Sequence, residues 1–444
     1  MGVNFDAQAG SGQIDVFEIT SNYSGETVDI RQGVVHLHIY ESIFDSTVRA
    51  DVSYMDTGYG ITKALSEDGF NNSGGEKTSL VVRDGKDRKI TFKGNNQLRT
   101  SDNNREAFNT HDTNKVSVFT SFYSKESMDN HLLSSRTTRK YERKISDNVV
   151  KILKEDLGTP KNVYVDPSKN DFNFLGGNEK PFHKVTWLCK RTVPDGFSGN
   201  GILAGYLFYE IADGAGTPGG YYFKSVDVLF GQNPVRRFIL SNTNQIPPGY
   251  DGKILNHKEF SSIDVDDHLI SGSLFQRQME TFEPFNNNYK KDDFDYKKQN
   301  LVSNNGGKEF WKIATDLNYQ DNVTRYSSKF FDTGVLPTGR NWNQQKKESK
   351  QINLEIDEII RQSTNRYNQM SSVNLNIIIP MDLGIHVGDM IFVDFPEIAS
   401  NKVQRPSKNK SGNYLIIDLC HKIGSAGCYS SVHLVRDSIY RKSK

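Results

Sequence analysis

Apolar and polar positions alternate with a period of two over most of the first 122 residues, as in strands that bury one face. The pattern predicts strands at residues 35–40, 48–54, 78–83, 89–93 and 116–122. In the first two strands the buried face is expected to carry Val35, Leu37, Ile39, Val52 and Tyr54, and the polar face His36, His38, Arg49, Asp51 and Ser53. Asp84-Gly85, between the third and fourth runs, favours a hairpin turn. Antiparallel strands of this length predict a small barrel or sandwich.

The period changes after residue 123, where helical patterns enter the chain. Ser146 is placed to cap a helix that ends before Gly158, and a second helix is predicted at residues 182–189. The inward positions of the two helices are Val149, Ile152, Leu153, Leu157, Phe182, Val185, Leu188 and Cys189. Strands are predicted at residues 205–211 and 221–229. The pattern therefore predicts an α+β module for this part of the chain.

Strands return after residue 235 and are interrupted by a polar stretch. Strands are predicted at 237–240 and 270–278, and again at 373–379, 390–395, 414–419 and 430–435, with a helix at 344–366. Between Glu283 and Glu309 the only aliphatic residues are Leu301 and Val302, too few to offset the entropy of ordering the segment. The stretch does carry aromatic residues: Phe282, Phe285, Tyr289, Phe294, Tyr296, Phe310 and Trp311. We expect it to be an arm that contacts a partner.

Charge and cysteine content narrow the class of protein. Lys plus Arg total 55 and Asp plus Glu total 54, which is not the clustered basic excess of a nucleic-acid-coating protein. Three cysteines do not make a disulfide framework, so synthesis in a reducing compartment is expected. The first twelve residues lack the apolar core of a signal peptide, and no stretch approaches the ~18–20 apolar residues of a membrane helix. We expect a protein without membrane or specific nucleic-acid contacts.

Two groups of residues have side chains that can bind metal ions. His36 and His38 share one side of a strand but have no evident third ligand, so a polar strand face is favoured over a metal site. The second group is Cys420, His421, Cys428 and His433. Strand alternation puts Cys420 and His421 on opposite faces, which favours paired hairpin cysteines or two core thiols. No metal or cofactor is predicted.

Residue patterns that would indicate catalysis are as unspecific as those for metal binding. The acidic groups Asp264, Asp266, Asp267 and Asp292, Asp293, Asp295 lack the spacing of a calcium loop, and solvated charge is favoured. Glu41 and Asp45 make a carboxylate pair of the glycosidase type, but a chain with this many carboxylates offers many such pairs. The aromatic residues Tyr206, Phe208, Tyr209, Tyr221, Tyr222 and Phe223 suit either a stacking platform or, as we favour, core packing. No catalytic residue is assigned.

The opening strands carry a recognisable motif. Residues 35–44 are followed by 48–58, with a Glu-Ser-Ile turn and an Asp before Gly58. This opening resembles that of the baseplate hub proteins of contractile-tailed, T-even-like phages. Further motifs follow in the family's order: Gly74-Gly75-Glu76-Lys77, residues 119–133, residues 141–153, Lys180-Pro181-Phe182 with Trp187-Leu188-Cys189-Lys190-Arg191, residues 205–210 and 220–225, and residues 388–393 and 411–416. The order across about 30–436 is more specific than any one motif, and residues 283–345 match nothing in the pattern.

The resemblance implies a fold and a role. The fold would be mainly β with an α+β module: a first tube-like β-barrel domain at 1–122, an α+β domain at 123–234, strands of a second tube-like domain at 235–282, a polar arm or extended connector at 283–351, and a helix with the rest of the second barrel at 352–444. Strands near 34–54 and 373–395 would occupy equivalent positions in the two barrels. The role would be structural: a homotrimeric ring that adapts the sixfold tail tube to the threefold central spike. The head of VgrG spike proteins is similar, but this chain lacks the β-helical repeats of a fused spike.

Partners implied by the resemblance are tail-tube or tube-initiator proteins, a separate central spike protein and baseplate wedge proteins. The protein would reside in the virion after assembly in the host cytoplasm. Two other classes remain open from the residues: a tail-associated cell-wall hydrolase, which needs a poised carboxylate or a metal triad, and a carbohydrate-binding receptor protein, which favours aromatic residues on loops.

Overall fold

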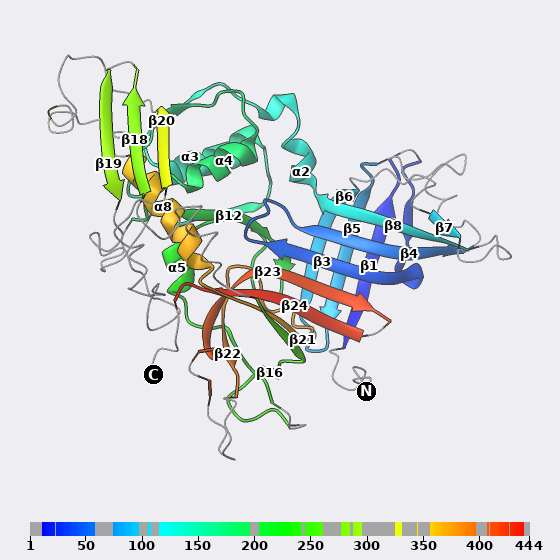
Figure 1. The fold of residues 1–444 in the computed structure, drawn as a ribbon. Helices are drawn as coiled ribbons and strands as arrows, with labels where there is room; N and C mark the ends of the chain where they lie inside the picture. Colours follow the sequence, from blue (N-terminus) through cyan, green and yellow to red (C-terminus); the bar gives the residue numbers. More distant parts are fainter. Residues whose placement is uncertain are drawn as a thin grey trace.

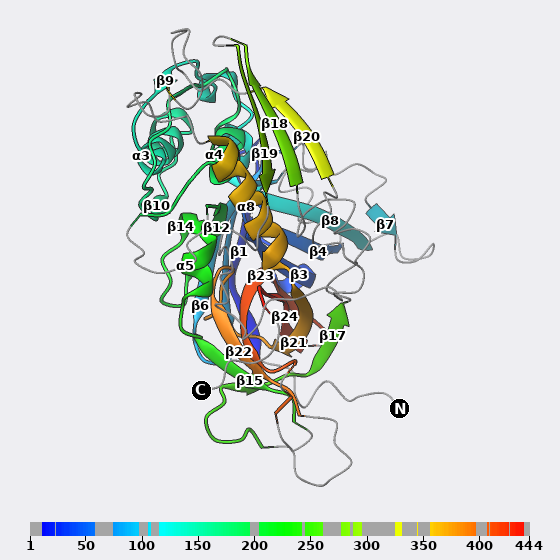
Figure 2. The ribbon, with the colours of Figure 1, turned by 60° about the vertical axis from the view of Figure 1, so that its left-hand side comes forward.

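A computed structural model describes most of the chain, and the protein in it is mainly β (Figures 1 and 2). The described residues are 11–22, 24–57, 74–96, 105–107, 115–195, 204–241, 245–260, 277–284, 287–294, 325–330, 344, 356–396, 406–407, 409–425 and 427–438. The predicted acidic group Asp264, Asp266 and Asp267 lies outside them, as does Asp295. Within the described part of the chain, no helix is long and apolar enough to cross a membrane.

The first β region is an antiparallel sheet that packs its apolar face inward. Its strands are β1 (Gly12–Thr20), β2 (Thr27–Asp29), β3 (Val34–Ser42), β4 (Arg49–Thr57), β5 (Lys77–Asp84), β6 (Lys89–Asn96), β7 (Arg105–Ala107) and β8 (Lys115–Ser124). They are hydrogen-bonded in the order β3-β4-β8-β6-β5-β1-β2, with β7 on β8. Leu37, Ile39, Val52 and Tyr54 are buried in one core, as the alternation predicts.

Val35 is an exception to the predicted alternation. The pairing of β3 with β4 shifts between Val34 and His36, which marks a β-bulge. A bulge inserts one residue and reverses the alternation before it. Val34 therefore packs against the core, whereas Val35 is only partly buried. Placing Val35 in the core was wrong for this reason.

The α+β module follows and lies beside the first β region (Figure 1). It contains α2 (Lys125–Asp129), β9 (Lys140–Tyr141), α3 (Ile145–Lys151), β10 (Asn162–Val165), β11 (Phe174–Leu175), α4 (Pro181–Cys189), β12 (Tyr206–Ile211), β13 (Asp213–Gly214), β14 (Gly220–Ser225) and α5 (Val226–Phe230). All eight predicted inward helix residues are buried, and Gly158 has the positive φ of 72° expected at a helix end.

Two local predictions in this module were wrong. Ser146 is not the cap residue, because α3 begins at Ile145 and Lys144 holds the cap position. Ser146 lies within the helix, and its N–H donates to Ser168 Oγ at 3.0 Å. The predicted strand 221–229 ends at Ser225, and α5 begins at Val226. Apolar residues continue through both elements, so the pattern alone does not mark the change from strand to helix.

The last β region is made by strands from both sides of the polar stretch. It contains β15 (Arg236–Ile239), β16 (Gly252–Lys253), β17 (Asn256–Phe260), β21 (Val373–Pro380), β22 (Met390–Asp394), β23 (Gly412–Gly424) and β24 (Gly427–Arg436). β15 pairs in parallel with β22, and β17 pairs with β21, so residues 236–260 and 373–436 build one unit. Helix α8 (Ile356–Met370) lies just before β21 in the chain, with Ile356 and Ile360 packed on the α+β core.

One antiparallel pairing joins the two β regions into a continuous sheet. β3 pairs with β23 from Asp418↔Ser42 to Gly424↔His36. The β3 and β4 strands are direct neighbours, whereas β21 and β22 are separated by β24 and β23. The expected equivalence of residues 34–54 and 373–395 was therefore wrong at the level of strand pairing.

The polar stretch contributes a separate three-stranded sheet (Figure 1, yellow-green and yellow). β18 (Arg277–Glu283) lies between β19 (Asn288–Phe294) and β20 (Arg325–Phe330). Lys290 Nζ lies 3.1 Å from Asp357 Oδ2 and ties this sheet to α8. β18 thus belongs with the arm, and backbone pairing supplies order that the composition alone did not predict. Asp292 and Asp293 lie on β19.

Candidate functional site

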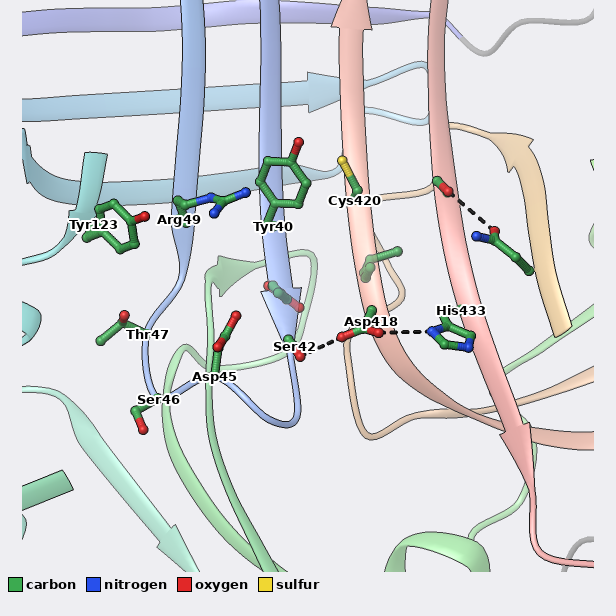
Figure 3. A pocket seen from close by; sticks show the side chains of 14 residues that line it. Tyr40, Ser42, Asp45, Ser46, Thr47, Arg49, Tyr123, Asp418, Cys420 and His433 are labelled. Carbon is green, nitrogen blue, oxygen red and sulfur yellow. Dashed lines mark hydrogen bonds and ion pairs between the residues drawn. The ribbon is translucent and has the colours of Figure 1, made fainter. Parts of the chain in front are cut away.

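A pocket of about 450 Å³ opens where the turn between β3 and β4 meets β23 and β24 (Figure 3). Its lining comes from both β regions: Tyr40, Glu41, Ser42, Asp45, Ser46, Thr47, Arg49 and Tyr123 from the first, and Asn376, Asp418, Leu419, Cys420, Ser431 and His433 from the last. Strand alternation explains the set, because Tyr40, Ser42, Asp418 and Cys420 all occupy the outward face of the joined sheet. The pocket therefore exists only because β3 pairs with β23.

Ser42, Asp418 and His433 form a hydrogen-bonded row across this pocket. Ser42 Oγ donates to Asp418 Oδ1 at 2.5 Å, and His433 Nδ1 lies 3.0 Å from Asp418 Oδ2 (Figure 3). Burial acts to raise the pKa of Asp418, but these two hydrogen bonds and the attraction of His433 outweigh it and lower that pKa. The three residue types are those of a serine hydrolase, but their order is not.

A hydrolase of that type needs the imidazole between the hydroxyl and the carboxylate, so that it can remove the hydroxyl proton. Here Asp418 lies between Ser42 and His433, and the hydroxyl proton points to the carboxylate. A carboxylate whose pKa is lowered is a weak base. The arrangement fixes β3, β23 and β24 to one another and does not activate Ser42 as a nucleophile.

Arg49 forms the opposite wall of the pocket. Its guanidinium lies over the Tyr40 ring, 4.4 Å from the ring centroid, and its Nη2 lies 3.2 Å from Asp51 Oδ2. Ser121 Oγ also donates to Asp51 Oδ1, at 2.6 Å. The charge of Arg49 is thus largely compensated within the sheet, and its stacking on Tyr40 holds the side chain in place.

Glu41 and Asp45 do not make a catalytic pair. Asp45 is exposed in the turn, whereas Glu41 is 2% exposed and points to the other side of the sheet. Glu41 Oε1 accepts from the Ala212 N–H at 3.0 Å and lies 3.1 Å from His386 Nδ1. These contacts join β3, the segment after β12 and the loop before β22. Glu41 is therefore a junction residue of the three parts of the chain.

The other candidate residues are dispersed. His36 and His38 lie on the outward face with ring centroids 6.4 Å apart, and the described residues contain no group of three metal-ligating side chains. Cys420 faces the pocket while His421 is buried behind it, which confirms that they occupy opposite faces. Cys189, Cys420 and Cys428 are free, buried thiols, so hairpin pairing of cysteines is excluded.

The aromatic residues of β12 and β14 are core residues. Tyr206, Phe208, Tyr209, Tyr221 and Phe223 are all buried, with Tyr222 packed beside them. Burial raises the pKa of the Tyr206 phenol. No aromatic platform for a sugar or base exists on this hairpin, so the preference for core packing is confirmed. Sequence reasoning missed the pocket, because its two halves are almost 380 residues apart in the chain.

Comparison with solved structures relates this fold to known proteins. The 43 kDa tail protein of prophage MuSo2 from Shewanella oneidensis superposes over 97% of this chain and 100% of its own, with a TM-score of 0.53 and 11% identity. A tail protein from Neisseria meningitidis MC58 superposes over 97% of this chain and 98% of its own, with a TM-score of 0.50 and 9% identity. The chain has the fold of phage tail proteins.

A more distant similarity extends beyond phages. An Escherichia coli component of the type VI secretion system, described as similar to the bacteriophage T4 tail proteins gp27 and gp5, covers 93% of this chain and 76% of its own, with 10% identity and a TM-score of 0.42. No family model and no curated protein matches the chain in sequence. The superpositions on the two tail proteins agree in fold with the resemblance seen in the sequence.

Proposed function

We propose that the protein is a structural hub of a phage tail baseplate, in which three copies form a ring between the sixfold tail tube and the threefold central spike. The observation that carries the proposal is the superposition on two tail proteins over almost the full length of each chain. Its partners would be tube or tube-initiator proteins, a spike protein and wedge proteins, within the virion and assembled in the host cytoplasm.

The joined sheet suits a mechanical role. β3 and β23 connect two β regions by backbone hydrogen bonds, so that neither region can rotate freely against the other. Three chains with two β regions each would offer six contacts to a sixfold tube on a threefold spike, made through two regions of different strand pairing. Closed barrels at 1–122 and at 235–282 with 352–444, and the domain limits given above, are part of this proposal, except that β18 belongs to the sheet of β19 and β20.

The proposal is tested by assembly. The purified chain, alone and with its co-expressed spike protein, is measured by multi-angle light scattering in physiological salt. A trimer, either alone or with the spike, is the expected result. A chain that stays monomeric with the spike present would refute the ring.

We further propose that the protein has no catalytic activity. The support is the geometry of the pocket, where Asp418 separates Ser42 from His433, and the burial of Glu41 in an ion pair. Pure protein should not turn over peptidoglycan, and alanine variants at His36, His38, Glu41, Ser42 or Asp389 should alter folding or assembly alone. If the wild-type protein turned over peptidoglycan and one such variant did not, the protein would be a cell-wall hydrolase instead.

A further inference from the structure

The charges around the β3–β23 pocket are unequally compensated. Arg49 is paired with Asp51, and Asp418 is paired with His433 and hydrogen-bonded to Ser42. The remaining charged side chain at the opening is Asp45, which is exposed and has no side-chain hydrogen bond or ion pair among the described residues. Its backbone N–H donates to the Ser42 carbonyl at 3.3 Å, which fixes the turn that presents it. The pocket therefore carries on Asp45 a negative charge that no side chain in the described part of the chain pairs.

The pocket walls are suited to a long side chain with a flat end. Tyr40, Tyr123 and Cys420 supply aromatic and apolar surface, and Ser46 and Thr47 supply hydroxyl groups (Figure 3). Ser431 adds a further hydroxyl group to the lining. Arginine buries its aliphatic stem on such surface, and its guanidinium forms a paired contact with a carboxylate. A volume of about 450 Å³ leaves room for one such side chain with part of its backbone.

Phe44, the residue next to Asp45, indicates that a fitting arginine side chain would belong to a protein. Phe44 is 59% exposed at the rim of the same turn, although its neighbour Ile43 is buried. An exposed aromatic residue beside a charged pocket is typical of the centre of a protein–protein contact, where aromatic residues and arginine are enriched. A free small cation would gain nothing from Phe44 outside the pocket.

We propose that this pocket receives an arginine side chain of another tail protein, with Asp45 pairing its guanidinium and Phe44 packing on the adjoining surface. The proposal rests on the function proposed above, since it names a contact of the same assembly. It places a partner at the joint between the two β regions. A partner bound there would contact both regions at once and stabilise their arrangement.

A peptide probe tests the charge recognition. The peptides Ac-Gly-Phe-Arg-Gly-NH2 and the same sequence with citrulline in place of arginine are titrated into the full chain, with binding followed by ligand-observed NMR. Wild type should bind the arginine peptide about threefold to fivefold more tightly, because an exposed ion pair contributes modestly. Asp45→Asn should lose this preference, and high salt should reduce it. Asp147→Asn, at an exposed carboxylate in the first turn of α3, is the matched control and should keep it.

Equal binding of both peptides by wild type, or a preference that survives in Asp45→Asn, would overturn the proposal. A second experiment identifies the occupant in the assembled tail. Phe44→p-benzoylphenylalanine is introduced in cells that assemble the phage, and purified particles are irradiated. A crosslink to a different tail protein supports the inference. Two outcomes overturn the proposed arginine contact while the hub function stands. One is a crosslink only to a second copy of this chain, and the other is no crosslink although the variant is present in the particles. Absence of the chain from the particles would refute the hub function itself, and the inference with it.

Discussion

Glu41 and His386 form a buried pair between positions 345 residues apart, with His386 Nδ1 3.1 Å from Glu41 Oε1. Burial acts to raise the pKa of Glu41 and to lower that of His386, but their mutual attraction and hydrogen bonds outweigh it in both cases. The net pKa of Glu41 is lowered and that of His386 is raised. These shifts favour the ionised form of both side chains, at the point where β3, the α+β module and the last β region meet.

Glu41→Ala should destabilise the protein by about 3–5 kcal/mol, because it leaves His386 buried without its counter-charge. The Ala212 N–H also loses its acceptor. Chemical denaturation of the variant and wild type measures the difference. Glu18→Ala, at an exposed position of β1, is the control and should change stability by less than about 0.5 kcal/mol. Equal stability of both variants would show that the pair does not hold the junction.

His421 should make stability fall in acid. Burial lowers the pKa of this imidazole from 6.5 to about 4, and the charges that face it are Glu41, His386, Asp382 and Asp84. A group that stays neutral in the folded protein but takes up a proton when unfolded stabilises the fold above pH 6.5. That stability is lost as pH falls toward 4. The loss amounts to about 3 kcal/mol.

His421→Asn isolates this effect from the other titrating groups. Asn retains a polar group near Ser430 Oγ, the present partner of His421 Nδ1 at 2.9 Å, but cannot take up a proton. The difference in unfolding free energy between wild type and variant should therefore change in favour of the variant as pH falls from about 7 to about 4. A difference that is constant with pH would contradict the prediction.

The β-bulge in β3 predicts unequal effects of two neighbouring substitutions. Leu37→Ala should cost about 2–5 kcal/mol, since Leu37 is fully buried and its removal leaves a cavity. Val35→Ala should cost about 1 kcal/mol or less, because the bulge turns Val35 partly toward solvent. Thermal and urea unfolding of the two variants would reveal the order, and a cost at Val35 as large as that at Leu37 would contradict the bulge.

Arg366 should be needed to fix α8 to the rest of the molecule. It is fully buried, with Nε 2.7 Å from Asp227 Oδ1 and Nη2 3.0 Å from Asp437 Oδ2. Arg366→Met removes the guanidinium that pairs with both buried carboxylates and should cost about 3–5 kcal/mol. Adding Asp227→Asn and Asp437→Asn to that variant should recover part of the loss. Arg83→Met, at a partly exposed position of β5, is the control, and an equal loss there would argue against a special role of Arg366.

The local order of the chain was largely predictable from sequence. Alternation located β3, β4, β5, β6 and β8, and the apolar spacing located α3 and α4, because one face of each element must be buried. The bulge at Val35, the helical start at Val226 and the sheet of β18, β19 and β20 were not predicted. The bulge lies in the pairing of β3 with β4, and the third strand of the separate sheet, β20, comes from more than 40 residues beyond β18. The helical start at Val226 lies within an apolar run that does not mark the change.

In the candidate site, too, some features could be predicted from sequence and others could not. Alternation separates the two faces of β3, β4 and β23, because strand geometry sends alternate side chains to opposite faces. The pairing of β3 with β23, the contact of Ser42 with Asp418 and the contact of Glu41 with His386 belong to the tertiary fold and have no signal in the sequence. The physical reason is that pairing between distant strands depends on burying both apolar faces at once, a condition of the whole fold that no local window of sequence contains.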